Sequence, residues 1–285
     1  MKTSIVTPEL INQLKSSGNW MVRFSNGGKG YNDFLWSAPG EWTICPWWSQ
    51  QSIDNPSCES GGLFGQGPGG YGYCNVGNRF EFCMTSGNHI SVGNNKIKVE
   101  KAMILATDQE AFEMLVLVTD DNFLGSLDLG SYRYSLPAGF THCGGSLDLL
   151  GYNHPLPAAF THCGGYLHLG GYNHPLPAGF THCDGSLNLR RYNHPLPAGF
   201  THCGGYLDLW GYNYPLPAGF THCGGYLYLG RYNHPLPVGF THCGGYLNLQ
   251  GYNHPLPAEF THCGGYLYLG GYDHPLPAGF THNIK

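Results

Sequence analysis

Histidine next to cysteine recurs along the second half of the chain, and this pair could bind a metal ion or carry thiol chemistry. The stretch YNHPLPAGFTHCGGYL begins at Tyr172, and its close copies place a His before a Cys, with a second His in most of them. Zinc needs three or four such ligands converging at about 2.0–2.3 Å. Whether these ligands converge depends on how the copies are arranged in space.

The copies form eight units spaced by 20 residues without an insertion. With a Leu taken as position zero of each unit, Leu recurs at +2, Tyr at +5, Leu-Pro at +9 and +10, and Phe-Thr-His at +13 to +15. Cys stands at +16 in seven units, from Cys143 to Cys263, and Asn283 replaces it in the last. A fixed period of this kind predicts a solenoid. Position zero is occupied by Leu127, Leu147, Leu167, Leu187, Leu207, Leu227, Leu247 and Leu267.

Alternation within each unit predicts which side chains face inward. In GGYLHL, Leu167 and Leu169 alternate with Tyr166 and His168, so a short strand would point both Leu side chains into the solenoid. Leu176-Pro177 begins a second side, from which Phe180 and Cys183 are expected to point inward. One unit buries too little apolar surface to offset the entropy lost on ordering it. The units are therefore expected to stack at about 4.8 Å in one parallel sheet along one flank.

Stacking answers the question about metal ligands. Identical side chains repeated every ~4.8 Å spread along a line and do not converge on one ion. The sequence therefore predicts a structural stack of thiols, with no metal site and no cofactor. Metal binding at the His rows is the weaker alternative.

The repeat resembles known repeat families. The pattern LxLGGYNHPLPxxFTHCGG, over roughly residues 123–285, is similar to short leucine-rich repeats of the bacterial LP type, and YNHPL resembles the Phe-Asn-x-Pro signature of FNIP repeats. The resemblance implies a protein-interaction surface and carries no catalytic residues. This sequence departs from those families at +5 and +7, where Tyr and His replace the apolar residues that the families have. CESGGLFGQGPGGYGY, from Cys58, resembles a Gly-rich module of bacterial and phage proteins for which we know of no assigned activity.

Two rows of His follow from the stacking. The +15 row runs from His142 to His282 and is expected to face outward, while a second row of six is interrupted by Tyr134 and Tyr214. Adjacent imidazolium ions would repel, so we expect lowered pKa values along the +15 row. Solvated His copied by duplication is the alternative. The second row contains His154, His174, His194, His234, His254 and His274.

Residues 1–120 lack the period and are predicted to form a compact α+β domain that also covers the first repeat. Thr7-Pro8-Glu9 is typical of a helix start, and Thr107 with Glu110 predicts a capping box for a second helix. Runs such as RFEFCM and KIKVEKAMIL predict strands. The fold class is thus an α+β N-terminal domain followed by a leucine-rich-repeat-like β-solenoid over residues 121–285.

Three features of the N-terminal domain could carry chemistry. Gly65-x-Gly67-x-x-Gly70 matches a dinucleotide fingerprint, but Pro68 and a Gly-rich run follow where a helix would be needed. Cys residues at 45, 58, 74 and 83 contain no Cys-x-x-Cys pair and are expected to be core thiols. A Trp group could line a ligand pocket or belong to the core. That group contains Trp36, Trp42, Trp47 and Trp48.

Composition limits the possible partners and compartments. The net charge is −5, and five Lys or Arg against seven Asp or Glu from Asp121 onward offer no basic stripe to nucleic acid. No signal peptide or membrane-spanning run is evident, so a cytoplasmic, reducing setting with free thiols is expected.

Positions that vary between the units predict a binding face. Positions +1 and +3 change from unit to unit, and Tyr recurs at −1, all on the outer face of the Leu-x-Leu strands. Such aromatic and Arg side chains are favoured at interfaces, although drift on a solvated face would give the same variation. The candidate binding residues are Tyr166, His168, Arg190, Tyr206, Trp210, Tyr226, Tyr228, Tyr246, Tyr266 and Tyr268.

The sequence favours a non-enzymatic protein-binding or scaffold protein with an unidentified protein partner. Self-association through the C-terminal unit is also expected, because only THNIK follows Phe280 to cover its strand edges. Two alternatives stay open: an effector whose N-terminal domain acts on a ligand or substrate, and a self-assembling structural protein.

Overall fold

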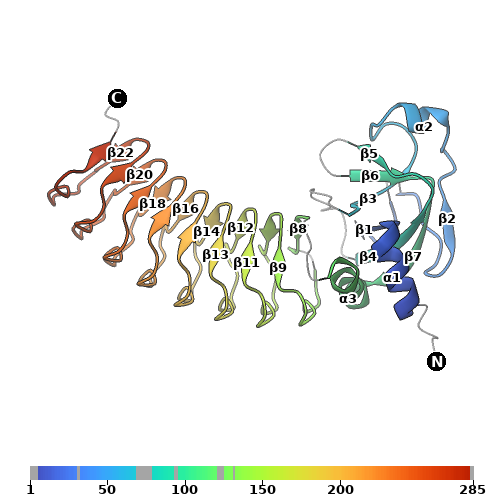
Figure 1. Cartoon of the computed structure of the whole chain (residues 1–285), viewed down its shortest axis with the longest axis horizontal. Coiled ribbons are helices and arrows are strands. Elements are labelled where there is room, and N and C mark those ends of the chain that lie inside the picture. Colours follow the sequence, from blue (N-terminus) through green and yellow to red (C-terminus); the bar gives the residue numbers. More distant parts are fainter. Residues whose placement is uncertain are drawn as a thin grey trace. The chain divides into compact units, whose positions relative to one another are not determined.

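The computed structural model describes residues 6–30, 33–68, 79–92, 96–120, 125–130 and 132–282. The chain divides into two compact units, residues 1–144 and residues 145–285 (Figure 1). The first unit contains the α+β domain together with the first repeat, and the second contains the other repeats.

The first helix begins where the sequence predicts. α1 spans Pro8–Ser17, the Thr7 hydroxyl accepts a hydrogen bond from Leu10 N at 3.3 Å, and Gly18 ends the helix with φ 65°. Ile11 and Leu14 are buried, as expected of one apolar face. A hydroxyl cap and a Pro in the first turn satisfy the helix start, and a Gly suits the left-handed C-terminal position.

The second predicted helix is also present, but its predicted capping box is wrong. α3 spans Asp108–Thr119, and the Thr107 side chain makes no capping hydrogen bond. Asp108 lies in the left-handed region, with φ 55°, and its carboxylate instead accepts a hydrogen bond from Phe80 N at 3.2 Å. The carboxylate therefore joins α3 to the neighbouring strand instead of capping the helix.

Two antiparallel sheets form the rest of the first unit, which confirms the α+β class. The four-stranded sheet has the order β1-β4-β7-β2, and the three-stranded sheet has the order β3-β6-β5. α3 packs on the larger sheet, with the Phe112 and Phe80 rings stacked at 4.0 Å. The elements are β1 Trp20–Ser25, β2 Trp42–Ile44, α2 Gln50–Asp54, β3 Leu63–Gly65, β4 Arg79–Ser86, β5 Ile90–Val92, β6 Lys96–Val99 and β7 Lys101–Thr107.

The first repeat packs against α3, as expected from the sequence. Tyr132 is buried, and its ring lies 4.9 Å from that of Phe112 and 6.5 Å from that of Phe80. This contact buries an aromatic ring at the start of the solenoid within the first unit.

Each 20-residue repeat contributes one rung of a parallel β-solenoid, which confirms the predicted architecture. The Leu-x-Leu strands pair in register, with Leu147 opposite Leu167 and Leu187 opposite Leu207. The order of this sheet is β22-β20-β18-β16-β14-β12-β10-β8. Its strands are β8 Leu127–Asp128, β10 Leu147–Asp148, β12 Leu167–His168, β14 Leu187–Asn188, β16 Leu207–Asp208, β18 Leu227–Tyr228, β20 Leu247–Asn248 and β22 Leu267–Tyr268.

A second parallel sheet is present that the sequence did not predict. The His-Cys segments pair from rung to rung, with Cys183 opposite Cys203, in the order β23-β21-β19-β17-β15-β13-β11-β9. Figure 1 shows the rungs stacked side by side. The strands are β9 His142–Cys143, β11 His162–Cys163, β13 His182–Cys183, β15 His202–Cys203, β17 His222–Cys223, β19 His242–Cys243, β21 His262–Cys263 and β23 Thr281–His282.

Tyr at +5 completes the solenoid core. The predicted inward side chains of a rung are buried, and Leu176 and Tyr172 are buried with them. Its hydroxyl accepts a hydrogen bond from Leu156 N at 2.8 Å and donates to His154 O at 3.3 Å, both in the preceding rung. A phenol therefore replaces the expected apolar residue because it also satisfies a buried backbone donor. Burial raises the pKa of the equivalent Tyr252 to about 12.

Candidate functional site

The thiols form a buried stack, as predicted. Cys183 is fully buried, and its Sγ donates to Gly165 O at 3.2 Å. The same bond joins Cys203 to Gly185 O at 3.2 Å in the next rung. The hydrogen bond with Cys163 and burial both raise the pKa of the Cys183 thiol, so it stays protonated. Within the described ranges, no group of three or more His, Cys, Asp or Glu side chains could hold a metal ion.

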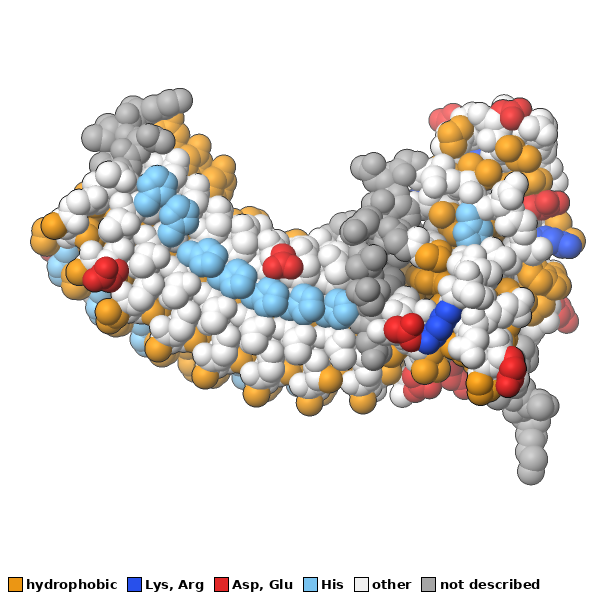
Figure 2. Space-filling model, viewed as in Figure 1, with side chains coloured by type: hydrophobic (Ala, Val, Ile, Leu, Met, Phe, Trp, Pro, Cys, Tyr) orange, Lys and Arg blue, Asp and Glu red, His pale blue; other side chains and the backbone are white. Residues whose placement is uncertain are grey.

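The +15 His side chains form an outward row of parallel rings. The imidazoles of His182 and His202 stack with centroids 5.1 Å apart and planes 13° apart, and Figure 2 shows the row running along one face of the solenoid. Thr181 Oγ1 lies 2.8 Å from Nδ1 of His182 in the same rung. Partial burial, and then the neighbouring imidazoles, lower the pKa of His222 and His242, so the expected direction is confirmed for these two.

The second His row joins successive rungs. Nε2 of His194 donates to Asn173 O at 2.8 Å, and Nε2 of His234 donates to Asn213 O at 2.8 Å. Tyr214 interrupts the row in sequence, but its hydroxyl donates to Asn193 O at 3.1 Å. A Tyr therefore makes the same bond to the previous rung as His does, although Nε2 of His254 does not make this bond.

The Leu-x-Leu sheet presents an aromatic outer face, which we define as positions −1, +1, +3 and +4 of the rungs. Tyr226 and Tyr246 stack with ring centroids 4.5 Å apart and planes 10° apart, and Tyr266 lies 5.1 Å beyond Tyr246. All three are exposed. Tyr166 and Tyr206 are half-buried and lie 5.9 Å apart, across the rung that has Ser186. The structure therefore brings the −1 Tyr residues together in two groups.

Part of the variation at +1 and +3 has a local structural cause. Where +1 is Asp or Asn, its side chain accepts the backbone N–H of +3, as Asp208 does from Trp210 N at 2.9 Å. Where +1 is His or Tyr, +3 is Gly: an added Cβ would lie 2.7 Å from His168 Nε2 at Gly170 and 3.1 Å from Tyr268 Cε1 at Gly270, whereas at Gly230 it would lie 3.0 Å from Trp210 Cδ1. His168 also pairs with Asp148, with Nδ1 to Oδ1 at 3.1 Å. Neither rule explains the −1 Tyr residues or Trp210.

Trp210 lies between two guanidinium groups from neighbouring rungs. Cζ of Arg190 lies 4.4 Å from the Trp210 ring centroid, and Cζ of Arg231 lies 5.4 Å from it. These two Arg residues and Arg191 are the only Lys or Arg in residues 145–282. Guanidinium groups over an indole face are attracted by its π electrons. We call Arg190, Trp210 and Arg231 the Arg–Trp cluster.

Arg231 was not predicted as a site residue, although the sequence contains a signal for it. Position +4 lies in the left-handed region, with φ 61° at Arg231 and φ 66° at Arg191. Five other rungs have Gly there: Gly151, Gly171, Gly211, Gly251 and Gly271. A non-Gly residue in this conformation is strained by about 1–2 kcal/mol. Arg at +4 is therefore less favourable for the backbone than the Gly found there in five other rungs.

The four predicted Trp residues do not form one pocket. Trp36 is buried and Trp48 packs against the same core, while Trp42 and Trp47 are exposed. Trp36 and Trp47 line one cavity of about 330 Å³, and Trp42 instead lies 5.9 Å from Lys101 Nζ. The expectation that these Trp residues belong to the core is thus confirmed for Trp36 and Trp48. Of the four, Trp36 and Trp47 line the cavity.

The four Cys residues of the α+β domain were predicted to be core thiols, and the structure confirms this for two of them. Cys45 and Cys83 are buried thiols, as expected, but Cys58 is exposed, so the prediction of a core thiol is wrong there. Cys74 and Gly70 lie outside the described residues, and Gly65 is in strand β3.

Among the helices that the structure describes, none has the length and apolar character needed to cross a membrane. No protein-family model, curated protein or solved structure matches the chain.

Proposed function

We propose that the protein is a non-enzymatic scaffold that binds a protein partner through the outer face of the Leu-x-Leu sheet. The partner segment carries carboxylate side chains beside aromatic or apolar ones. This chemistry matches the two kinds of group on the face, which are the Arg–Trp cluster and the exposed Tyr side chains.

The Arg–Trp cluster is the observation that carries the proposal. Its two guanidinium groups are on the exposed side of a unit that is otherwise weakly acidic, with five Asp or Glu against three Arg in residues 145–282. Arg231 occupies a strained backbone position that Gly fills in other rungs. Strain that is retained at a surface residue favours a function for its side chain.

The stacked Tyr side chains supply the apolar part of the face. Tyr226, Tyr246 and Tyr266 present rings in contact with one another, and each ring is about two-fifths exposed. Tyr, Trp and Arg are the residue types that dominate binding energy at protein interfaces, because they combine a large contact area with a hydrogen-bonding end. The stack and the Arg–Trp cluster lie on adjacent rungs, so one extended segment can contact both.

The test is quantitative capture of partners with three forms of the protein. The variant Trp210→Ser, Tyr226→Ser, Tyr246→Ser removes the face, and Val238→Ser changes an exposed apolar residue that is not on it. A partner recovered with the wild type is purified and titrated against each form. We expect the affinity to fall at least about tenfold in the triple variant and to be unchanged in Val238→Ser. Equal affinity for all three folded forms would refute the proposal.

We also propose self-association through the C-terminal rung. Leu269 is 37% exposed, whereas Leu249 and Leu229 at the same position are fully buried. β22 and β23 are the outermost strands of the two parallel sheets in the described chain, and such edges pair readily with another copy. Light scattering should give twice the monomer mass of 31.2 kDa, and Leu269→Lys should restore the monomer. A monomer in both forms would contradict this proposal, and long assemblies seen by electron microscopy would favour a structural role.

A further inference from the structure

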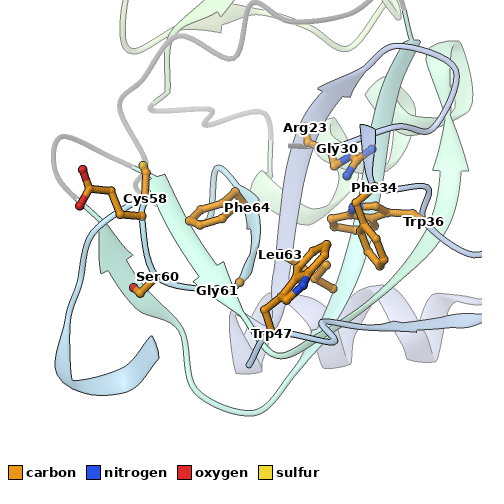
Figure 3. A pocket seen from close by; sticks show the side chains of 12 residues that line it. Arg23, Gly30, Phe34, Trp36, Trp47, Cys58, Ser60, Gly61, Leu63 and Phe64 are labelled. Atoms are coloured by element: carbon orange, nitrogen blue, oxygen red, sulfur yellow. The ribbon is translucent and has the colours of Figure 1, made fainter. Parts of the chain in front are cut away.

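The first unit contains a cavity of about 330 Å³ with aromatic walls and one cationic side chain. Phe34, Trp47, Leu63 and Phe64 form its apolar part, and Arg23 and Trp36 add nitrogen donors. Figure 3 shows Phe34, Trp36 and Trp47 gathered on one side, with Cys58 and Ser60 on the other. The volume is at the lower end of the range for small-molecule sites and suits a ligand of one or two rings.

Arg23 is held rigidly at the cavity. Its Nε lies 2.6 Å from Glu81 Oε2, and Nη2 donates to Gly28 O at 3.0 Å and to Lys29 O at 3.3 Å. The guanidinium carbon also lies 3.8 Å from the ring centroid of Trp36. Arg23 is 4% exposed, so these contacts fix the side chain in a buried place. None of them uses Nη1.

Trp36 offers a second donor beside Nη1. The side chain is 5% exposed, and its Nε1 makes no hydrogen bond to any described residue. A Cβ added at Gly30 would lie 3.0 Å from Trp36 Nε1 and 3.4 Å from Arg23 Nη1. Both N–H groups therefore approach Gly30, and the missing side chain leaves them open. Trp36 Nε1 is not fully enclosed, since it keeps some accessible surface, and it can therefore donate a hydrogen bond to a group bound in the cavity.

The charges around the cavity favour an anion. Glu81 is fully buried and contacts two guanidinium groups, those of Arg23 and, at 3.2 Å, of Arg79. Ser25 Oγ also donates to Glu81, at 2.8 Å. One carboxylate thus faces two cations, which leaves one positive charge beside the cavity. The carboxylate of Glu59, which also lines the cavity, is exposed to solvent, where its repulsion of an anion is screened.

We propose that this cavity binds a small aromatic carboxylic acid. The ring lies against Phe34, Trp47 and Phe64, and the carboxylate accepts hydrogen bonds from Arg23 Nη1 and Trp36 Nε1. Aromatic walls favour a ring through stacked and edge-to-face contacts, and a guanidinium with a neighbouring N–H favours a carboxylate over a neutral group. This site is independent of the outer face of the solenoid, so either assignment can fail without the other.

The test uses two probe acids, phenylacetate and indole-3-carboxylate, together with their neutral amides. Binding to the full chain is measured by calorimetry, and the indole N–H resonances are followed by NMR. We expect each acid to bind at least about tenfold more tightly than its amide, with a shift of the buried Trp36 N–H signal. No binding of either acid at millimolar concentration, or equal binding of acid and amide, would overturn the proposal.

Two variants and a matched control locate the site without disturbing the buried ions. Trp47→Ala removes an exposed wall residue, and Gly30→Ala places a methyl group against both donors. Trp42→Ala removes an exposed Trp that does not line the cavity. We expect at least about tenfold weaker acid binding in the first two variants and unchanged binding in the third. If Trp47→Ala melts like the wild type and still binds the acids equally well, the proposal is wrong.

Discussion

The two units satisfy their buried polar groups in different ways. In the solenoid, a neutral bond repeats from rung to rung, as when Tyr212 OH accepts from Leu196 N at 2.8 Å. In the first unit, the buried groups are ionic and occur once, as in Glu81 between Arg23 and Arg79. Repetition spreads stability over many small and equal contributions. A single ionic cluster concentrates it in a few residues, because a buried charge without its partner is very unfavourable.

The largest expected effect is the loss of the ionic cluster. Glu81→Gln leaves two guanidinium groups without their carboxylate and should lower the free energy of unfolding of the first unit by about 3–5 kcal/mol. Urea unfolding followed by Trp fluorescence measures this. Glu41→Gln, at an exposed carboxylate, should change it by less than about 0.5 kcal/mol. A similar change in the free energy of unfolding for Glu81→Gln and Glu41→Gln would show that the stability of the first unit is not concentrated in the ionic cluster.

A smaller loss is expected for one repeated bond. Tyr212→Phe leaves the buried Leu196 N–H without an acceptor and should cost about 1–3 kcal/mol. The matched control is Tyr226→Phe, which removes a hydroxyl from an exposed ring and should be nearly neutral. Urea unfolding of the solenoid gives both values. A cost for Tyr212→Phe equal to that of Glu81→Gln would show that the solenoid also depends on single residues.

Arg231→Gly should stabilise the solenoid by about 1 kcal/mol, because Gly adopts the left-handed conformation without strain. Arg190→Gly makes the same exchange at +3, where φ is not positive, and should give no such gain. The proposed function adds a second readout, since both variants should weaken partner binding. An Arg231→Gly protein that is less stable than the wild type would show that the side chain serves the fold.

The smallest expected effect is a pH dependence of the +15 His row. The folded state lowers the pKa of His222 and His242, so the unfolded chain binds more protons just below the ordinary His pKa near ~6.5. Stability should therefore be complete above that pH and fall as the pH drops through it. The melting temperature should decrease from about pH 7.5 to about pH 5.5.

The double variant His222→Gln, His242→Gln isolates the contribution of the row. Its melting temperature should depend less on pH than that of the wild type. Some dependence should remain, because burial also lowers the pKa of His89 in the first unit. An identical pH dependence in the two proteins would assign the effect to His89 and would refute a role for the row.

Local rules in the sequence predicted the features that depend on near neighbours. Thr7 and Pro8 cap α1 as expected, and the inward places of Leu167, Leu169 and Cys183 follow from alternation along an extended chain. The prediction failed where a distant residue competes, as when Asp108 bonds Phe80 N while Thr107 is left without a capping bond.

The sequence by itself determined the solenoid, because a strict 20-residue period leaves each unit able to bury its apolar side chains only against its own copies. Only the tertiary structure decided that the +5 Tyr is buried, that two Arg residues flank Trp210, and that Arg23 and Trp36 share one cavity. Arg23 and Trp36 belong to no repeat, and the period that relates Arg190 to Trp210 does not reveal that their side chains meet or that Arg231 reaches the same ring. Their meeting depends on how strands and loops pack in three dimensions, which no local pattern specifies.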